Sequence, residues 1–248
     1  MCIFSQPVKT VSGTRIFARL QDRRQYLAYE MRLAAAQDLA MILPLPTRAR
    51  DEGQVKFIDL SGYAKFFDDM EKCFPMPLSR GFGLGAQAAS LSAPLVVHQV
   101  GAFEASFVPA LADFTRLDAR FRLADDIWRQ FPAYADYGFA VFQLRAGDAR
   151  VHPMALGFET RDPSTLYFPT SHVHDGAAHP TAHFDHSLYA QGAAGTDWKQ
   201  GEVLPRNVMD FGNFLIADRT RGLVQRDAPV LQRTLKGEYP NQDIRLSI

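Results

Sequence analysis

Hydrophobic and polar residues alternate within the first sixty positions in a way that predicts β-strands. Residues 25–33 carry large apolar side chains at every second position from Leu27 on, which is the two-residue period of a half-buried strand. Short apolar runs bounded by Ser-Gly, Pro and other turn residues predict further strands nearby. These runs cover residues 2–8, 14–20, 39–45 and 55–60. The first part of the chain is therefore expected to form β-sheet.

Helical spacing first appears after residue 61. Several large apolar residues there recur at intervals of three and four, which places them on one face of a helix. They are Tyr63, Phe66, Phe67, Met70 and Phe74. Shorter helices are predicted for residues 109–117 and 123–131, and the small, glycine-rich residues 79–93 favour a loop.

Strand patterns return in the second half of the chain. They cover residues 95–107, 137–144, 151–158 and 166–174. No internal repeat, low-complexity tract or linker interrupts this order, so we expect one α+β domain over residues 1–248. Its sheets should be mostly antiparallel, with a few short helices. Residues 219–248 mix charges with sparse apolar residues and are expected to wrap the surface as a tail.

The composition of the chain bears on which partners it would bind and in which compartment it would lie. Lys and Arg total 27, as do Asp and Glu, so the formal net charge is zero and no electrostatic attraction to nucleic acid or an anionic membrane is expected. The sequence contains no apolar run of about 18 residues, so no membrane-spanning helix is expected. The N-terminal residues lack the pattern of a secretory signal, which favours the cytoplasm. With Cys2 and Cys73 alone, a disulfide framework is excluded.

Residues 171–191 concentrate the unusual chemistry of the chain, because they hold five of its seven histidines. These are His172, His174, His179, His183 and His186. Neutral imidazole is the commonest nitrogen ligand of zinc, copper and iron. In a strand, residues two apart face the same side, so His172 and His174 should point together from the end of strand 166–174.

The second half of this stretch allows two geometries. If Pro180 opens a helix, the three later histidines lie four and three apart and share a face. If residues 182–190 form a strand, His183 and Asp185 share a face and His186 points away. Asp185, like Asp175, would be a metal ligand or would orient an imidazole through a hydrogen bond.

The leading hypothesis is therefore a mononuclear metal site that activates water or dioxygen for a small-molecule substrate. Its ion would be zinc, copper or iron, held by His172, His174, His183 and His186, with His179 in reserve. Two alternatives stay open for the same residues. One is a proton-transfer or phosphate-type site without metal. The other is an exposed polar loop, which in a non-enzymatic binding module would act as a pH-sensitive surface.

Three segments together carry a resemblance to a known family. They are ILPLP at residues 42–46, VHQVGAFEASFV at 97–108, and the paired strands of 137–170 that end in LYFPT. Together with an early cysteine, this order resembles a bacterial domain family of unknown function. The resemblance implies an architecture for residues 2–170 and no activity. The histidine stretch lies outside the shared pattern.

Cys2 carries a second, more local resemblance. Removal of Met1 would make it the N-terminal residue, whose thiol can act as a nucleophile with its own α-amine as the base. Arg19 and Asp22 follow in FARLQD, which resembles the Arg-x-x-Asp element of the cholylglycine-hydrolase group of cysteine amidases. That resemblance implies that Arg19 and Asp22 contact the nucleophile, although no counterpart of the group's downstream Asn and Arg is found. The alternative function is thus an N-terminal cysteine amidohydrolase. Cys2 can equally be a small apolar strand residue or a metal ligand.

Overall fold

Two β-sheets of unequal size form the body of the protein in this computed structural model, which describes residues 3–49, 52–74, 98–100, 103–193, 197–201 and 215–248. The seven-stranded sheet has the order β12 (Lys199–Gly201), β13 (Val230–Pro240), β11 (Thr181–Gln191), β2 (Thr10–Gln21), β3 (Arg24–Ala35), β9 (Gly147–Glu159) and β5 (Val55–Asp59). The five-stranded sheet has the order β1 (Ile3–Phe4), β4 (Leu39–Leu45), β8 (Gly138–Leu144), β7 (Phe103–Val108) and β6 (His98–Val100). A small third sheet pairs β10 (Thr165–Phe168) with β14 (Ile244–Ser247).

Successive side chains along a strand point to opposite faces of its sheet and so pack in different hydrophobic cores. In β4, Leu39 and Met41 join the core between the two sheets, while Ala40 and Ile42 join a second core on the outer face. The same division holds in β3, where Leu27 faces the inner core and its neighbour Ala28 an outer one. Central strands of each large sheet are therefore covered on both faces, which explains why β4 is buried along its whole length.

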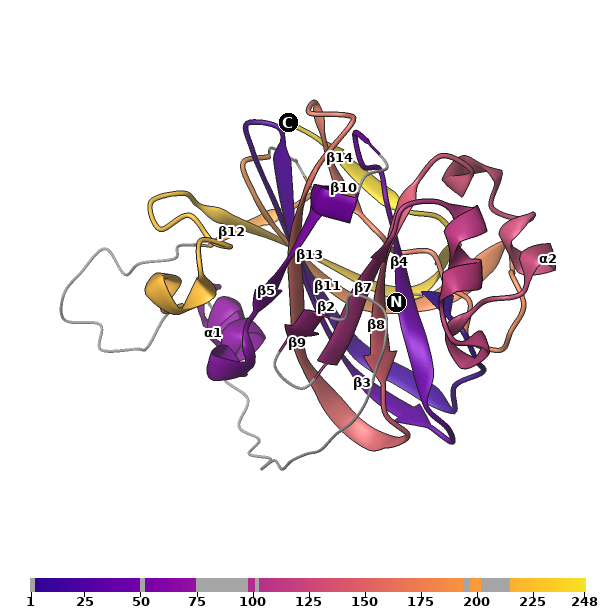
Figure 1. Cartoon of the computed structure of the whole chain (residues 1–248). Coiled ribbons are helices and arrows are strands. Elements are labelled where there is room, and N and C mark those ends of the chain that lie inside the picture. Colours follow the sequence, from indigo (N-terminus) through magenta and orange to yellow (C-terminus); the bar gives the residue numbers. More distant parts are fainter. Residues whose placement is uncertain (1–2, 50–51, 75–97, 101–102, 194–196, 202–214) are drawn as a thin grey trace.

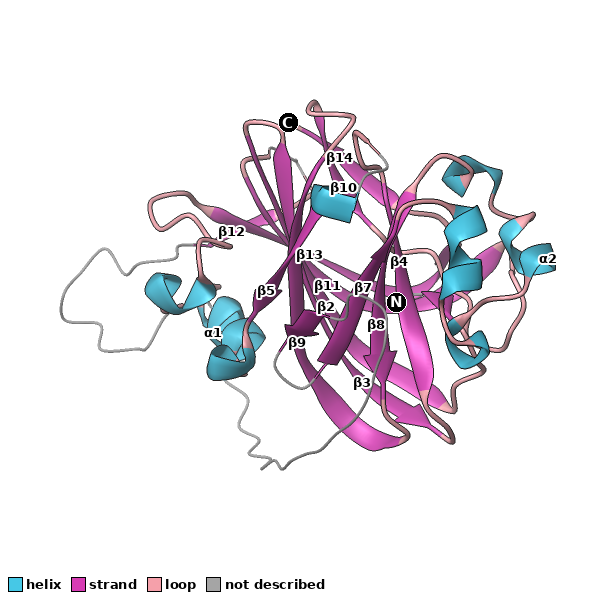
Figure 2. Ribbon diagram, in the orientation of Figure 1, coloured by secondary structure: helices cyan, strands magenta, loops and turns pink. Residues whose placement is uncertain are grey.

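Short helices supply the outer cover, as Figures 1 and 2 show. The five-stranded sheet is covered by η3 (Leu111–Arg116), η4 (Ala119–Phe121), α2 (Asp125–Trp128) and η5 (Pro132–Tyr134). The seven-stranded sheet is covered by α1 (Phe66–Lys72), η2 (Ser61–Tyr63) and η6 (Ala217–Thr220), and η1 (Glu52–Gln54) precedes β5. None of the helices in the described residues is long and apolar enough to cross a bilayer.

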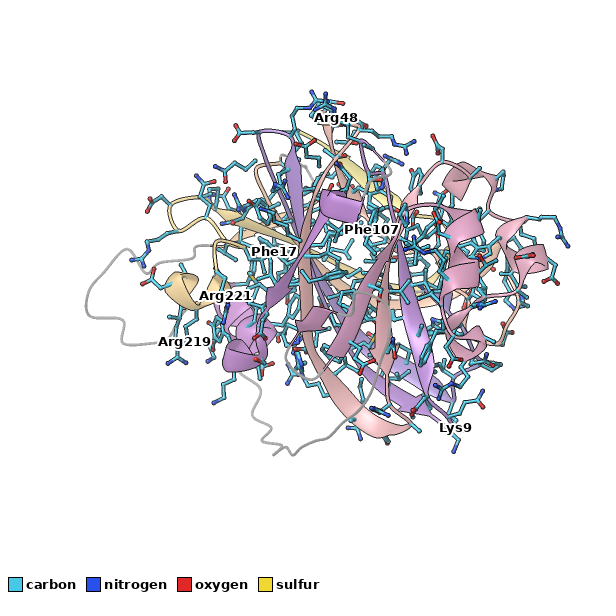
Figure 3. All side chains as sticks on the ribbon, viewed as in Figure 1. Lys9, Phe17, Arg48, Phe107, Arg219 and Arg221 are labelled. Atoms are coloured by element: carbon cyan, nitrogen blue, oxygen red, sulfur yellow. The ribbon has the colours of Figure 1, made fainter. Side chains whose placement is uncertain are left out.

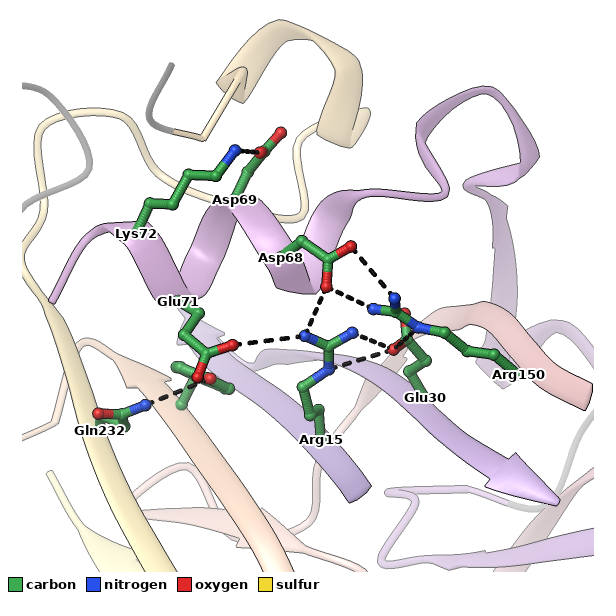
Figure 4. Close-up of polar contacts among 9 residues, drawn as sticks. Arg15, Glu30, Asp68, Asp69, Glu71, Lys72, Arg150 and Gln232 are labelled. Carbon is green, nitrogen blue, oxygen red and sulfur yellow. Dashed lines mark hydrogen bonds and ion pairs between the residues drawn. The ribbon is translucent and has the colours of Figure 1, made fainter. Parts of the chain in front are cut away.

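An ion cluster around the buried Glu30 ties α1 to the seven-stranded sheet (Figure 4). Glu30 of β3 is 1% exposed and accepts hydrogen bonds from Arg15 of β2 and Arg150 of β9, the latter at 2.7 Å. Both guanidinium groups also reach Asp68 of α1, at 2.9 and 2.6 Å. Opposite charges on four elements therefore fix the helix over strands that are distant in the sequence.

The expected fold class is confirmed in its coarser form: the chain is mostly β-sheet with a few short helices. The helix expected after residue 61 is α1, and its predicted apolar face is buried against the sheet. Of the two segments expected to form short helices, 109–117 contains the 3₁₀ helix η3 and 123–131 contains the short α-helix α2. Residues 79–93, expected to form a loop, lie outside the described residues.

The C-terminal segment differs from the expected surface tail. Its β13 pairs with both β11 and β12 inside the seven-stranded sheet, and β14 pairs with β10. From Leu231 on, the side chains of β13 alternate between the inner core and solvent. The buried Leu231 and Leu235 share one face, and the exposed Lys236 and Glu238 lie on the other. That alternation gives the segment the sparse apolar content that suggested a tail.

Candidate functional site

Three of the five clustered histidines lie side by side against the inner face of the seven-stranded sheet. His172 and His174 come from the segment between β10 and β11, and His186 comes from β11 itself. The ring centroid of His172 lies 5.0 Å from that of His174 and 5.3 Å from that of His186, with the planes inclined by 8° and 9°. Phe184 packs on the same imidazole at 4.4 Å. The result is a stack with His172 in the middle.

The turn between β13 and β14 positions the first two histidines. Asn241 accepts a hydrogen bond from the backbone N–H of His172 at 2.6 Å and donates to the carbonyl of the same residue at 2.9 Å. Asp243 accepts from the backbone N–H groups of Thr170 and Ser171 at 2.9 and 3.0 Å. These bonds fix an irregular segment that belongs to no regular strand, in place of the strand expected to continue to residue 174.

Asp243 is itself held by hydroxyl groups. Tyr134 and Tyr167 donate to its Oδ2 at 2.7 and 2.5 Å, and the Ser171 hydroxyl lies 3.0 Å from its Oδ1. Burial and the neighbouring Asp243 charge raise the pKa of both tyrosines, so their hydroxyls keep the proton they donate. Sequence reasoning missed Asn241 and Asp243. PNQD at 240–243 is a turn signal, but no local signal shows which distant segment the turn contacts.

The N-terminal strand runs beside the histidines. Ile3 forms a parallel bridge with Val173, and the N–H of Phe4 donates to the Val173 carbonyl at 3.1 Å. The ring of Phe4 lies 5.5 Å from that of His174. The start of the described chain is therefore laid along the segment that carries His172 and His174.

Burial keeps this pair of imidazoles neutral. Desolvation lowers the pKa of His174 to about 4 and holds the pKa of His172 far below its usual range. The Nε2 atoms of both rings are buried and have no hydrogen-bond partner among the described residues. Buried polar atoms without a partner are uncommon and call for an explanation.

The stacked arrangement does not hold a metal as it stands. The lone pair of an imidazole nitrogen lies in the ring plane, so nearly parallel, stacked rings do not aim their lone pairs at one point about 2.0–2.1 Å away. Among the described residues, no group of three or more His, Cys, Asp or Glu side chains is arranged to bind a metal ion. Metal binding stays a prediction, and would need at least one ring to turn.

The other histidines and aspartates of the stretch lie apart from the stack. His179 pairs with Asp175 at 2.9 Å, and His183 lies 3.4 Å from Glu238, all on the surface. Asp185 accepts from the N–H of Gly13 at 2.8 Å. Of the two geometries considered for residues 182–190, the structure shows the strand: His183 projects outward and His186 inward.

The amidase-like pair also lies away from the histidines. In the parallel pairing of β2 with β11, His186 is opposite Thr14 and Arg19 is opposite Gln191. At roughly 3.3 Å per residue this separates Arg19 from the stack by about 17 Å along the strands. The Arg19 side chain is 3% exposed and donates to the carbonyls of residues 222 and 223. Asp22 occupies the β2–β3 turn with φ 57°. Cys2 lies outside the described residues.

Comparison with known proteins gives only remote similarities. No protein-family model matches the chain, and no curated protein does. The crystal structure of baculovirus P35 aligns with a TM-score of 0.48 and 10% identity over 99% of both chains. The caspase-8/P35 complex aligns with the same TM-score and identity over 95% of this chain and 96% of that chain. At this distance the similarity establishes neither a shared fold nor a shared function.

Proposed function

We propose that the protein is a cysteine-dependent amidohydrolase in which His172 serves as the base for the thiol of Cys2. The observation that carries the proposal is the parallel bridge between Ile3 and Val173. Cys2 precedes Ile3 in the sequence, so we expect its thiol to come near the same segment. The bridge partner Val173 is flanked by His172 and His174, whose Nε2 atoms lack partners among the described residues. A neighbouring thiol is a chemically suitable partner.

The register favours His172 over His174 as the base. Side chains two apart in an extended segment point to the same side. Phe4 already packs on His174, and Cys2 and His172 each precede those residues by two positions. The imidazole base does not depend on a free α-amine, so this chemistry is independent of Met1 removal.

His172 is neutral and has a free lone pair for a proton, but burial lowers its pKa and weakens the isolated imidazole as a base. The Nε2 atom would take the thiol proton while the sulfur forms a bond to the carbonyl carbon of an amide. The negative charge that forms next to the ring offsets the desolvation that lowers the pKa of the isolated imidazole. The amine leaves with that proton, and water then hydrolyses the thioester to release the acid and restore the thiol. Stacking on both faces would hold the ring plane fixed during these steps.

Alkylation with iodoacetamide tests the pairing, and Cys73 supplies an internal reference. Burial raises the pKa of the Cys73 thiol to about 11, so it should react slowly. Cys2 is expected to react readily at pH 7, as measured by peptide mass spectrometry. His172→Gln should slow Cys2 by about 100-fold, the lower range for loss of a general base. His183→Gln removes an exposed imidazole and should leave the rate unchanged.

Acyl transfer is tested with p-nitrophenyl acetate as the probe. Intact-mass measurement should detect an acetyl group on Cys2 that turns over in the wild type and fails to form in Cys2→Ser. Equal alkylation rates of Cys2 in the wild type and in His172→Gln, with no acetylation, would refute the proposal.

A metal site on the same histidines is the second candidate. The observation that favours it is the pair of buried Nε2 atoms that are free to accept an ion if a ring turns. Elemental analysis of protein purified without a histidine tag should then find one zinc, copper or iron per chain. A His172→Ala/His174→Ala variant should lose it. Substoichiometric metal in both proteins would rule this candidate out.

A further inference from the structure

A cavity of about 310 Å³ lies where η2, α1 and η6 meet, over the outer face of the seven-stranded sheet, whereas the histidine stack lies on the inner face. Its polar lining comes from Tyr63, Lys65, Asp69, Lys72 and Arg219, and Ile216 supplies an apolar wall. This volume is at the lower end of the range for small-molecule sites.

The buried polar groups that line the cavity, Asp69 and Tyr63, make hydrogen bonds to other groups of the protein. Asp69 is 5% exposed, and its two carboxylate oxygens accept from the Tyr63 hydroxyl at 2.9 Å and the Lys72 ammonium at 2.6 Å. Tyr63 of η2 accepts in turn from the N–H of Ile216, the residue before η6, at 2.8 Å, so Tyr63 links the start of η6 to Asp69 of α1. Figure 4 shows the Lys72–Asp69 contact. The single carboxylate of the lining is therefore neutralised by a single lysine.

The two other cationic side chains of the lining have no acidic partner among the described residues. Lys65 and Arg219 are both exposed, and within the described part of the chain neither has an acidic side chain at ion-pair distance. The neighbouring Asp218 pairs instead with Arg226 at 2.6 Å. A concave surface with two uncompensated positive charges attracts an anion.

We propose that this cavity binds the phosphate group of a small organic phosphate. A phosphate monoester carries about −1.5 to −2 charges at pH 7, which matches the two free cations, whereas a carboxylate would neutralise only one. The planar fork of Arg219 suits two oxygens of one phosphate. The cavity exceeds the volume of the anion, and Ile216, which is 41% exposed, offers an apolar contact for the organic part.

Isothermal titration calorimetry at constant ionic strength tests the proposal with phenyl phosphate, and with benzoate as a ring-matched monoanion. Phenyl phosphate should bind saturably and more tightly than benzoate. In Lys65→Gln/Arg219→Gln the dissociation constant should rise at least about tenfold, the expected effect of losing charge-assisted hydrogen bonds. Both residues are exposed, so the variant should fold.

A double variant with the same loss of charge controls for long-range electrostatics. Lys9→Gln/Arg48→Gln removes two cations that lie well away from Arg219 in Figure 3. Its affinity for phenyl phosphate should stay within about twofold of the wild type, because salt screens charges beyond a Debye length of about 10 Å. Equal weakening in both double variants overturns the proposal. So does the absence of saturable binding to the wild type, or binding of benzoate as tight as that of phenyl phosphate.

Discussion

Acid should destabilise the protein through the imidazoles of the buried His172 and the half-buried His174. Each has a folded-state pKa well below the ordinary value of 6.5, because desolvation favours the neutral form. A group whose folded pKa is depressed in this way binds more protons when unfolded. For a histidine the resulting stability is fully present above pH 6.5 and is lost as the pH falls.

The magnitude between pH 7 and pH 5 follows from the unfolded state. An unfolded imidazole gains most of its proton over this range, while the folded His174, with a pKa of about 4, gains little. The difference costs about 2 kcal/mol for one histidine and about 4 kcal/mol for the pair. A loss of that size is a large fraction of a typical unfolding free energy.

Urea titration at the two pH values measures this loss, with the buried Trp128 and Trp198 as fluorescence reporters. His174→Phe keeps an aromatic ring beside Phe4 and removes one titrating group. The variant should therefore lose about 2 kcal/mol less than the wild type between pH 7 and pH 5. His183→Gln should lose as much as the wild type. An unchanged pH dependence in His174→Phe would refute the reasoning.

Other predictions concern the packing that holds the site, each measured as the free energy of unfolding at pH 7. Glu30→Gln removes the charge of a buried carboxylate that accepts from the half-buried Arg15 and the exposed Arg150, and should cost about 2 kcal/mol. Glu159→Gln, at an exposed pair, should cost less than about 1 kcal/mol, and equal costs would contradict the role of the cluster. Gly138→Ala places a Cβ 2.6 Å from the Phe107 ring and should cost about 1–3 kcal/mol; a neutral effect would show that the ring moves aside. Asp243→Asn weakens the acceptor of two backbone N–H groups and should cost about 2 kcal/mol. It should also slow alkylation of Cys2, and an unchanged rate would argue against its positioning of His172.

Local patterns predicted much of the secondary structure for a physical reason. Where one face of an element is buried, the period of its apolar residues reports its conformation directly. This holds for Leu27 and its alternate neighbours in β3 and for Phe66 and Phe67 in α1. For β11 the sequence left helix and strand open, and the structure shows the strand, in which His183 is exposed and His186 is buried.

The sequence by itself determined that chemistry would concentrate in residues 171–191, but not which histidines meet. His172 and His174 lie together through hydrogen bonds from Asn241 and Asp243, some seventy positions away. His186 joins them because β11 pairs with β2 and β13 in one register, which turns that side chain inward. Burial then decides their charge, because the desolvation that lowers both pKa values exists only once distant segments enclose the rings. Pairing partners and burial are properties of the assembled sheets, so only the tertiary structure decided them.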